Sequence, residues 1–186
     1  NGAMALFAAH GLDASPDPHE RAAGARLLKD RALGRPPGRE RIAALKEAFH
    51  AYHAIYRESG DPFPGINAAT LALRAGDTSH AGALAEALLT DPMVAAAGDY
   101  YAAVTLAEAL LVLGRTEEAA AALQRPVVRD SRDHGARASS ARQLLLLADH
   151  LGVGQDARRA IAAPLAPPRV AHYSGHMFAV EPAAEE

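Results

Sequence analysis

The segment ALLVLGRTEEAAAAL, residues 109–123, contains the features of two helices joined by a tight turn. Gly114 predicts the end of the first helix, because a residue without a Cβ adopts the left-handed cap conformation at little cost. Thr116 is expected to cap the second helix, with Glu117 and Glu118 in its first turn, where the helix dipole favours acidic side chains. The apolar residues before the glycine recur every three or four positions, as on one face of a helix: Ala103, Leu106, Leu110 and Leu113.

The same turn recurs at a fixed interval along the chain. Its glycine and the alanine five positions later each recur every 38 residues, at Gly38, Gly76, Gly114 and Gly152 and at Ala43, Ala81, Ala119 and Ala157. Pro126 and Pro164, which are 38 residues apart, are expected to stop the second helices. A fixed period of this length is typical of stacked supersecondary units. The alanine is expected where the paired helices approach closely, since a larger side chain would push them apart.

These patterns predict an all-α protein, a right-handed α-solenoid of about four antiparallel helix pairs with a short extended C-terminal tail. Residues 1–4 are interpreted as a tag remnant, residues 5–166 as the helical repeat domain and residues 167–186 as the tail. The first pair is the least regular, because LGRPPGRE (33–40) forms a longer turn. The expected helices are 18–33, 39–59, 65–75, 78–90, 98–113, 116–124, 134–151 and 154–163.

The composition excludes several classes of protein. The 186 residues include no cysteine, so disulfides, thiolate nucleophiles and cysteine-ligated metals are excluded. A formal net charge of -3 provides no basic field for nucleic acid. No apolar run approaches the roughly 20 residues that a membrane-spanning helix needs. We therefore expect a cytoplasmic protein that uses neither a membrane nor nucleic acid as a partner.

Three segments resemble a known family. The spacing Gly-x4-Ala, with a small residue seven positions before the glycine, resembles the tetratricopeptide repeat, although the period is 38 residues and the usual one is about 34. PGINAATLALRAGD (64–77), GARLLKDRAL (24–33) and AYHAIYRESGDPF (51–63) resemble the TRAFs-binding domain of the apoptosis signal-regulating kinases and its bacterial relatives. The resemblance covers roughly residues 20 to 160. It implies a protein-docking and regulatory platform, which in bacteria is often joined to signalling or conflict-effector domains.

The tail leaves the helical pattern. Residues 170–174 alternate in a way that predicts a strand, and VAHYSGHM (170–177) resembles the first strand and glycine turn of a nucleotide-sensing Rossmann-like domain. In that interpretation Ser174, Gly175 and His176 would contact a nucleotide, and the chain would be part of a longer protein with a fused sensing domain. In the alternative interpretation the tail packs on the last helix pair.

Candidate partner-binding residues lie on the first helix of each pair, on the face expected to line the concave side of the solenoid. Asn67, Thr70 and Arg74 share one helix face, and Tyr101, Thr105 and Glu108 share the corresponding face of the next first helix. Arg142 is the candidate on the following one. Core packing is an open alternative for the tyrosine, and capping or a turn bond for Asn67.

The sequence offers little for catalysis or for a cofactor. Glu47, His50 and His53 share a helix face, but the pattern lacks a third histidine, so a solvated surface is favoured over a metal site. His172, Ser174 and His176 lack an acidic residue that would orient a base. We therefore expect no enzyme activity, no metal and no cofactor. The expected function is a non-enzymatic scaffold that binds a protein or peptide in a bacterial signalling or conflict-effector protein; the alternative is a nucleotide-sensing protein.

Overall fold

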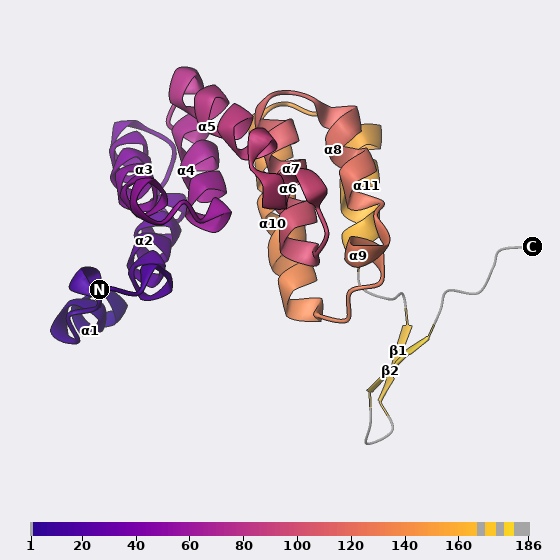
Figure 1. The fold of residues 1–186 in the computed structure, drawn as a ribbon, viewed down its shortest axis with the longest axis horizontal. Coiled ribbons are helices and arrows are strands. Elements are labelled where there is room, and N and C mark those ends of the chain that lie inside the picture. Colours follow the sequence, from indigo (N-terminus) through magenta and orange to yellow (C-terminus); the bar gives the residue numbers. More distant parts are fainter. Residues whose placement is uncertain (1, 167–169, 174–176, 181–186) are drawn as a thin grey trace, which may run out of the picture.

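A computed structural model describes residues 2–166, 170–173 and 177–180 of the chain (Figure 1). The fold is all-α, with one pair of short antiparallel strands near the C-terminus. The α-helices are α1 (Gly2–Ala9), α2 (Pro18–Leu33), α3 (Arg39–Ser59), α4 (Pro62–Arg74), α5 (Thr78–Thr90), α6 (Pro92–Ala96), α7 (Tyr100–Val112), α8 (Thr116–Leu123), α9 (Pro126–Arg129), α10 (His134–His150) and α11 (Gln155–Ala162). Two short 3₁₀ helices, η1 (Leu12–Ala14) and η2 (Ala163–Leu165), and the strands β1 (Val170–Tyr173) and β2 (Met177–Val180) complete the fold.

Aspartate caps start several of the helices. Asp17, Asp61 and Asp91 each precede a proline, and their carboxylates accept a hydrogen bond from the backbone amide two residues later at 2.8–2.9 Å. Proline fits the first helical position because its missing N–H would have no partner there. Each of these Asp-Pro pairs marks the start of a helix.

Three turns between helices have the same geometry. Gly76, Gly114 and Gly152 adopt φ angles of 85°, 74° and 67°, in the left-handed region that favours glycine. In each turn the amide of the next residue donates to the carbonyl five positions earlier: Asp77 to Ala72, Arg115 to Leu110 and Val153 to Ala148, all at 2.9 Å. This bond closes the end of the first helix and directs the chain into the second.

The alanines after these turns are buried to different degrees. Ala81 and Ala119 are 1% and 0% exposed, as expected for positions where two helices meet closely. Ala157 is half-buried, and Ala43 is exposed. The expectation for Ala43 is wrong because the first turn is built differently. Gly38 has φ 148° and ψ -176° and precedes α3, whereas α2 already ends at Leu33.

Eight of the helices match the expected ranges to within a few residues, and the remaining helices were not expected. α1, α6 and α9 are short, and both α6 and α9 begin at a proline. Thr116 does not cap α8, so that expectation is wrong. Arg115 occupies the cap position without a side-chain cap bond, and its guanidinium instead forms two hydrogen bonds, of 2.7 and 2.6 Å, to the carboxylate of Glu118.

The helices pack mainly against their neighbours in the chain, from α2 against α3 to α7 against α8. Further contacts join equivalent helices of successive pairs. The first helix of one pair contacts the first helix of the next, as α4 contacts α7 and α7 contacts α10, and the second helix α8 contacts the second helix α11. Small and branched side chains fill the space between them, with fully buried Leu71, Leu88, Leu111, Leu123 and Leu144. Among the described residues, no helix is long and apolar enough to cross a membrane.

The helical part ends in a cluster of backbone contacts around Arg137. Its guanidinium donates to the carbonyls of Arg129 and Ser131, both at 3.0 Å. It also donates to those of Pro164 at 3.0 Å and Ala166 at 2.8 Å. One side chain of α10 therefore holds both the loop after α9 and the end of η2.

Beyond that point, β1 and β2 form an antiparallel pair in which Val170 faces Val180 and Tyr173 faces Met177. The expected strand is thus present at residues 170–173. Met177, the next described residue after Tyr173, begins a second strand that is antiparallel to the first. In a Rossmann-like domain, by contrast, the first strand is followed by a helix. Ser174, Gly175 and His176, the residues expected to contact a nucleotide, lie outside the described residues.

Candidate functional site

The first helices bring polar residues at equivalent positions together. Asn67 of α4 lies 38 positions after Lys29 of α2, and the Lys29 Nζ donates a 2.7 Å hydrogen bond to the Asn67 Oδ1. The Asn67 Nδ2 donates to the carbonyl of Phe63 at 2.9 Å, which fixes the orientation of the amide. The next residues in this series are Thr105 of α7 and Gln143 of α10. We call Lys29, Asn67, Thr70, Thr105, Glu108 and Gln143 the inner polar row.

One contact in this row joins helices that are not neighbours in the chain. The hydroxyl of Thr70 in α4 donates to the carbonyl of Asn67 at 3.0 Å. The same hydroxyl accepts a 3.4 Å hydrogen bond from the Gln143 Nε2 of α10. Although α7 lies between α4 and α10 in the sequence, this bond brings a side chain of α4 into contact with one of α10.

The inner polar row contains an acid and a base with perturbed titration. Glu108 is 6% exposed, and burial raises the pKa of its carboxyl to about 7, although the nearby charge of Lys29 acts in the opposite direction. Burial lowers the pKa of the Lys29 ammonium, against the attraction of Glu108. The Lys29 Nζ also lies 5.9 Å from the ring centroid of Tyr52, whose buried hydroxyl has no hydrogen-bond partner among the described residues.

Burial divides the predicted partner-binding residues into two groups. Asn67, Thr70, Thr105 and Glu108 are 5%, 2%, 9% and 6% exposed. The expectation that they face an open groove is therefore wrong, because folding buries all four side chains, with Asn67 against Lys29 of α2 and Thr70 against Gln143 of α10. Arg74 is half-buried, Arg142 is exposed and Tyr101 is 65% exposed. Sequence reasoning missed Phe63, 38 positions before Tyr101, which is 48% exposed.

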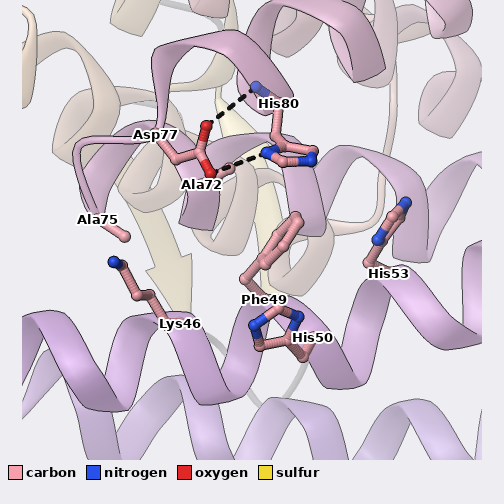
Figure 2. Close-up of a pocket in the computed structure, with 8 residues that line it drawn as sticks. All are labelled: Lys46, Phe49, His50, His53, Ala72, Ala75, Asp77 and His80. Carbon is pink, nitrogen blue, oxygen red and sulfur yellow. Dashed lines mark hydrogen bonds and ion pairs between the residues drawn. The ribbon is translucent and has the colours of Figure 1, made fainter.

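A separate pocket lies between α3 and the turn that joins α4 to α5 (Figure 2). Its volume is about 220 Å³. Eight residues line it: Lys46, Phe49, His50 and His53 from α3, Ala72 from α4, and Ala75, Asp77 and His80 from the turn and the start of α5. We call it the histidine pocket.

The ring of Phe49 forms an aromatic cluster with the three imidazoles of the histidine pocket. His53 stacks on it at a centroid distance of 5.2 Å and an angle of 18°. His50 and His80 lie at 5.0 and 5.8 Å and are tilted by 56° and 55°. The buried phenylalanine thus holds histidines from two helices around one hollow (Figure 2).

The charges of the pocket come from a few groups. The carboxylate of Asp77 caps α5 by accepting from the His80 amide at 3.1 Å, and its second oxygen lies 2.8 Å from the His80 Nδ1. These bonds lower the pKa of Asp77. Burial lowers the pKa of His53, and the charges of Arg57, His80 and His50 lower it further. Each protonation of an imidazole therefore makes the hollow more positive.

The sequence indicated only part of this pocket. His50 and His53 were placed on one helix face, but Phe49 and His80 were missed, because only the packing of α5 on α3 brings His80 to that face. Glu47, the third residue of the sequence pattern, pairs at 2.7 Å with Arg31 of α2 instead. Within the described part of the chain, no three side chains of the metal-binding types converge in a way that could hold a metal ion.

Comparisons with known proteins give no relative: no protein-family model, no curated protein and no solved structure matches this chain.

Proposed function

We propose that this protein is a non-enzymatic, tetratricopeptide-like scaffold that binds a protein or peptide partner. Its helix pairs would be the 38-residue units of a right-handed α-solenoid. The three equivalent glycine turns and the Lys29–Asn67 bond between residues 38 positions apart support this architecture. The resemblance to the TRAFs-binding domain and its bacterial relatives supports a docking role in a bacterial signalling or conflict-effector protein.

The observation that carries the proposal is the size and position of the histidine pocket. Sites for small molecules and cofactors usually have volumes of about 300–1,000 Å³. At about 220 Å³, the histidine pocket is smaller and open to the surface, which suits one side chain of a bound peptide. The rigid stack of helices supplies a fixed surface around it, as helical repeat proteins do for their partners.

Selection from a random peptide library displayed on phage, against the immobilised protein, tests this proposal. Ala75→Phe is designed to fill the pocket, and Ala160→Phe makes the same change on the exposed side of α11. Selected peptides should bind the wild type and Ala160→Phe equally but bind Ala75→Phe at least about tenfold more weakly, a loss of about 1.4 kcal/mol. Failure to select any peptide, or equal binding to all three proteins, would refute a peptide-binding role for this surface.

A further inference from the structure

We propose that the histidine pocket accepts the carboxylate side chain of a glutamate in the partner peptide, with proton uptake by the surrounding imidazoles. This inference rests on the proposed peptide-binding function and specifies the chemistry that the peptide must present. Three properties of the pocket carry it: its lining, its charge and the absence of guanidinium groups among its lining residues.

The lining fits a side chain with an apolar stem and a polar end. The Phe49 ring and the methyl groups of Ala72 and Ala75 provide apolar surface (Figure 2). Lys46, on the same helix as His50 and His53, places an ammonium at the pocket. A glutamate can pack its two methylene groups on the phenyl ring and direct its carboxylate toward these nitrogen atoms.

The charge of the lining favours an anion. Asp77 is the one acidic residue among the eight that line the pocket, and its two oxygens already contact the backbone amide and the ring of His80. Lys46 and the imidazoles of His50 and His53 therefore remain available to an anion, whereas the His80 ring already contacts Asp77 through its Nδ1. A lysine or arginine side chain of a partner would meet like charges instead.

A carboxylate is favoured over a phosphoryl group by the kind of cation present. Phosphoryl groups are commonly recognised by arginine, whose planar guanidinium forms paired hydrogen bonds to two oxygens. None of the eight lining residues is an arginine. Arg57 acts on His53 from the next turn of α3 but does not line the pocket.

The surroundings of the histidines determine the pH dependence. From α3 they are faced by Lys46 and Arg57, and from α5 by Asp77; Ala72 and Ala75 contribute no charge. An imidazole has an ordinary pKa near 6.5, which burial lowers for His53, and a bound carboxylate raises the pKa of an imidazole beside it. Binding should therefore strengthen as the pH falls from about 8 to 6, and weaken again below about 4.5, where the glutamate itself becomes protonated.

The test uses the full chain and three blocked pentapeptides with alanine at the flanking positions and glutamate, glutamine or phosphoserine at the centre. NMR signals of the imidazole C–H groups report binding at pH 6.0 and 8.0. We expect the glutamate peptide to shift the signals of His50, His53 and His80 and to bind about fivefold more tightly at pH 6.0, since each exposed charge pair contributes modestly. Lys46→Gln should weaken binding about threefold. His150→Gln, at an exposed position of α10, should not change the affinity.

Each other result has a defined meaning. Equal binding of the glutamine peptide would overturn the role of charge but leave the peptide-binding function standing. Stronger binding of the phosphoserine peptide would overturn the choice of a carboxylate. If no peptide shifts these signals while phage-selected peptides still bind, the glutamate pocket is refuted and the proposed function is not; if both fail, both are refuted.

Discussion

The buried carboxyl of Glu108 should make the stability of this protein fall as the pH rises. Its pKa increases from 4.5 in the unfolded chain to about 7 in the folded protein. Below pH 4.5 both states hold the proton, so the carboxyl has no differential effect. Between about pH 4.5 and 7 the unfolded state releases the proton and the folded state keeps it, which favours unfolding. The free energy of unfolding should therefore decrease by about 3 kcal/mol over this range, since one pKa unit corresponds to about 1.4 kcal/mol.

Glu108→Gln removes this titration while keeping the shape of the side chain. At pH 5 the variant should be only slightly more stable than the wild type, because most of the loss of stability in the wild type occurs between pH 5 and 7. At pH 8 the variant should have gained up to about 3 kcal/mol relative to the wild type. The assay is urea unfolding followed by circular dichroism at half-unit pH steps from 5 to 8.

Glu86→Gln, at an exposed position of α5, is the matched control. Its free energy of unfolding should change with pH in the same way as that of the wild type. Subtracting each variant from the wild type cancels the other titrating groups, including His53, whose lowered pKa makes the protein less stable as the pH falls below about 6.5. If the free energies of unfolding of Glu108→Gln and the wild type change with pH in the same way, the Glu108 carboxyl is solvated. The burial described for it in the inner polar row would then be wrong.

Three other predictions concern packing. Ala119→Leu should lower the free energy of unfolding by about 1–3 kcal/mol, because Ala119 is fully buried between helices. Ala121→Leu, at an exposed position of the same helix, should have little effect, and equal melting temperatures for the two variants would contradict this. Gly65→Ala should also destabilise, since a Cβ there would lie 2.9 Å from the Tyr56 ring, whereas Gly82→Ala, with its nearest neighbour at 4.0 Å, should stabilise by about 0.5–1 kcal/mol in the same melts. Arg137→Met should expose the amides of α9 and η2 to faster hydrogen exchange without affecting α4, because four carbonyls at the ends of these elements lose their shared donor. Equal acceleration of exchange in all helices would argue against a local role.

Sequence features within a few residues of each helix end were sufficient to predict most of the helices. The Asp-Pro starts and the turns at Gly76, Gly114 and Gly152 depend on backbone conformation within a few residues, so the sequence alone specified them. Gly38 shows that a residue repeated at a fixed interval does not by itself specify the same turn. It lies at the expected interval, but the prolines at positions 36 and 37 change the turn around it.

The candidate sites were harder to predict, because periodicity shows which residues share a helix face and not what covers that face. Thr105 and Glu108 were correctly placed on one side of α7, yet that side is buried in the folded protein. The histidine pocket needed the docking of α5 on α3, which brings His80 to Phe49. Neither arrangement has a signature in the spacing of residues along the chain.

The bond between Thr70 and Gln143 bears on how the chain unfolds. In an extended stack of repeats each unit contacts only its neighbours, and segments can lose structure one after another from an end. Here α4 is tied to α10 across the intervening unit, and Lys29 of α2 acts on Glu108 of α7. Fraying of the C-terminal pair would then loosen contacts deep in the N-terminal half. Helices from α2 to α10 should accordingly open together in a single event, and a pulling experiment should record one large rupture for them rather than a series of small ones.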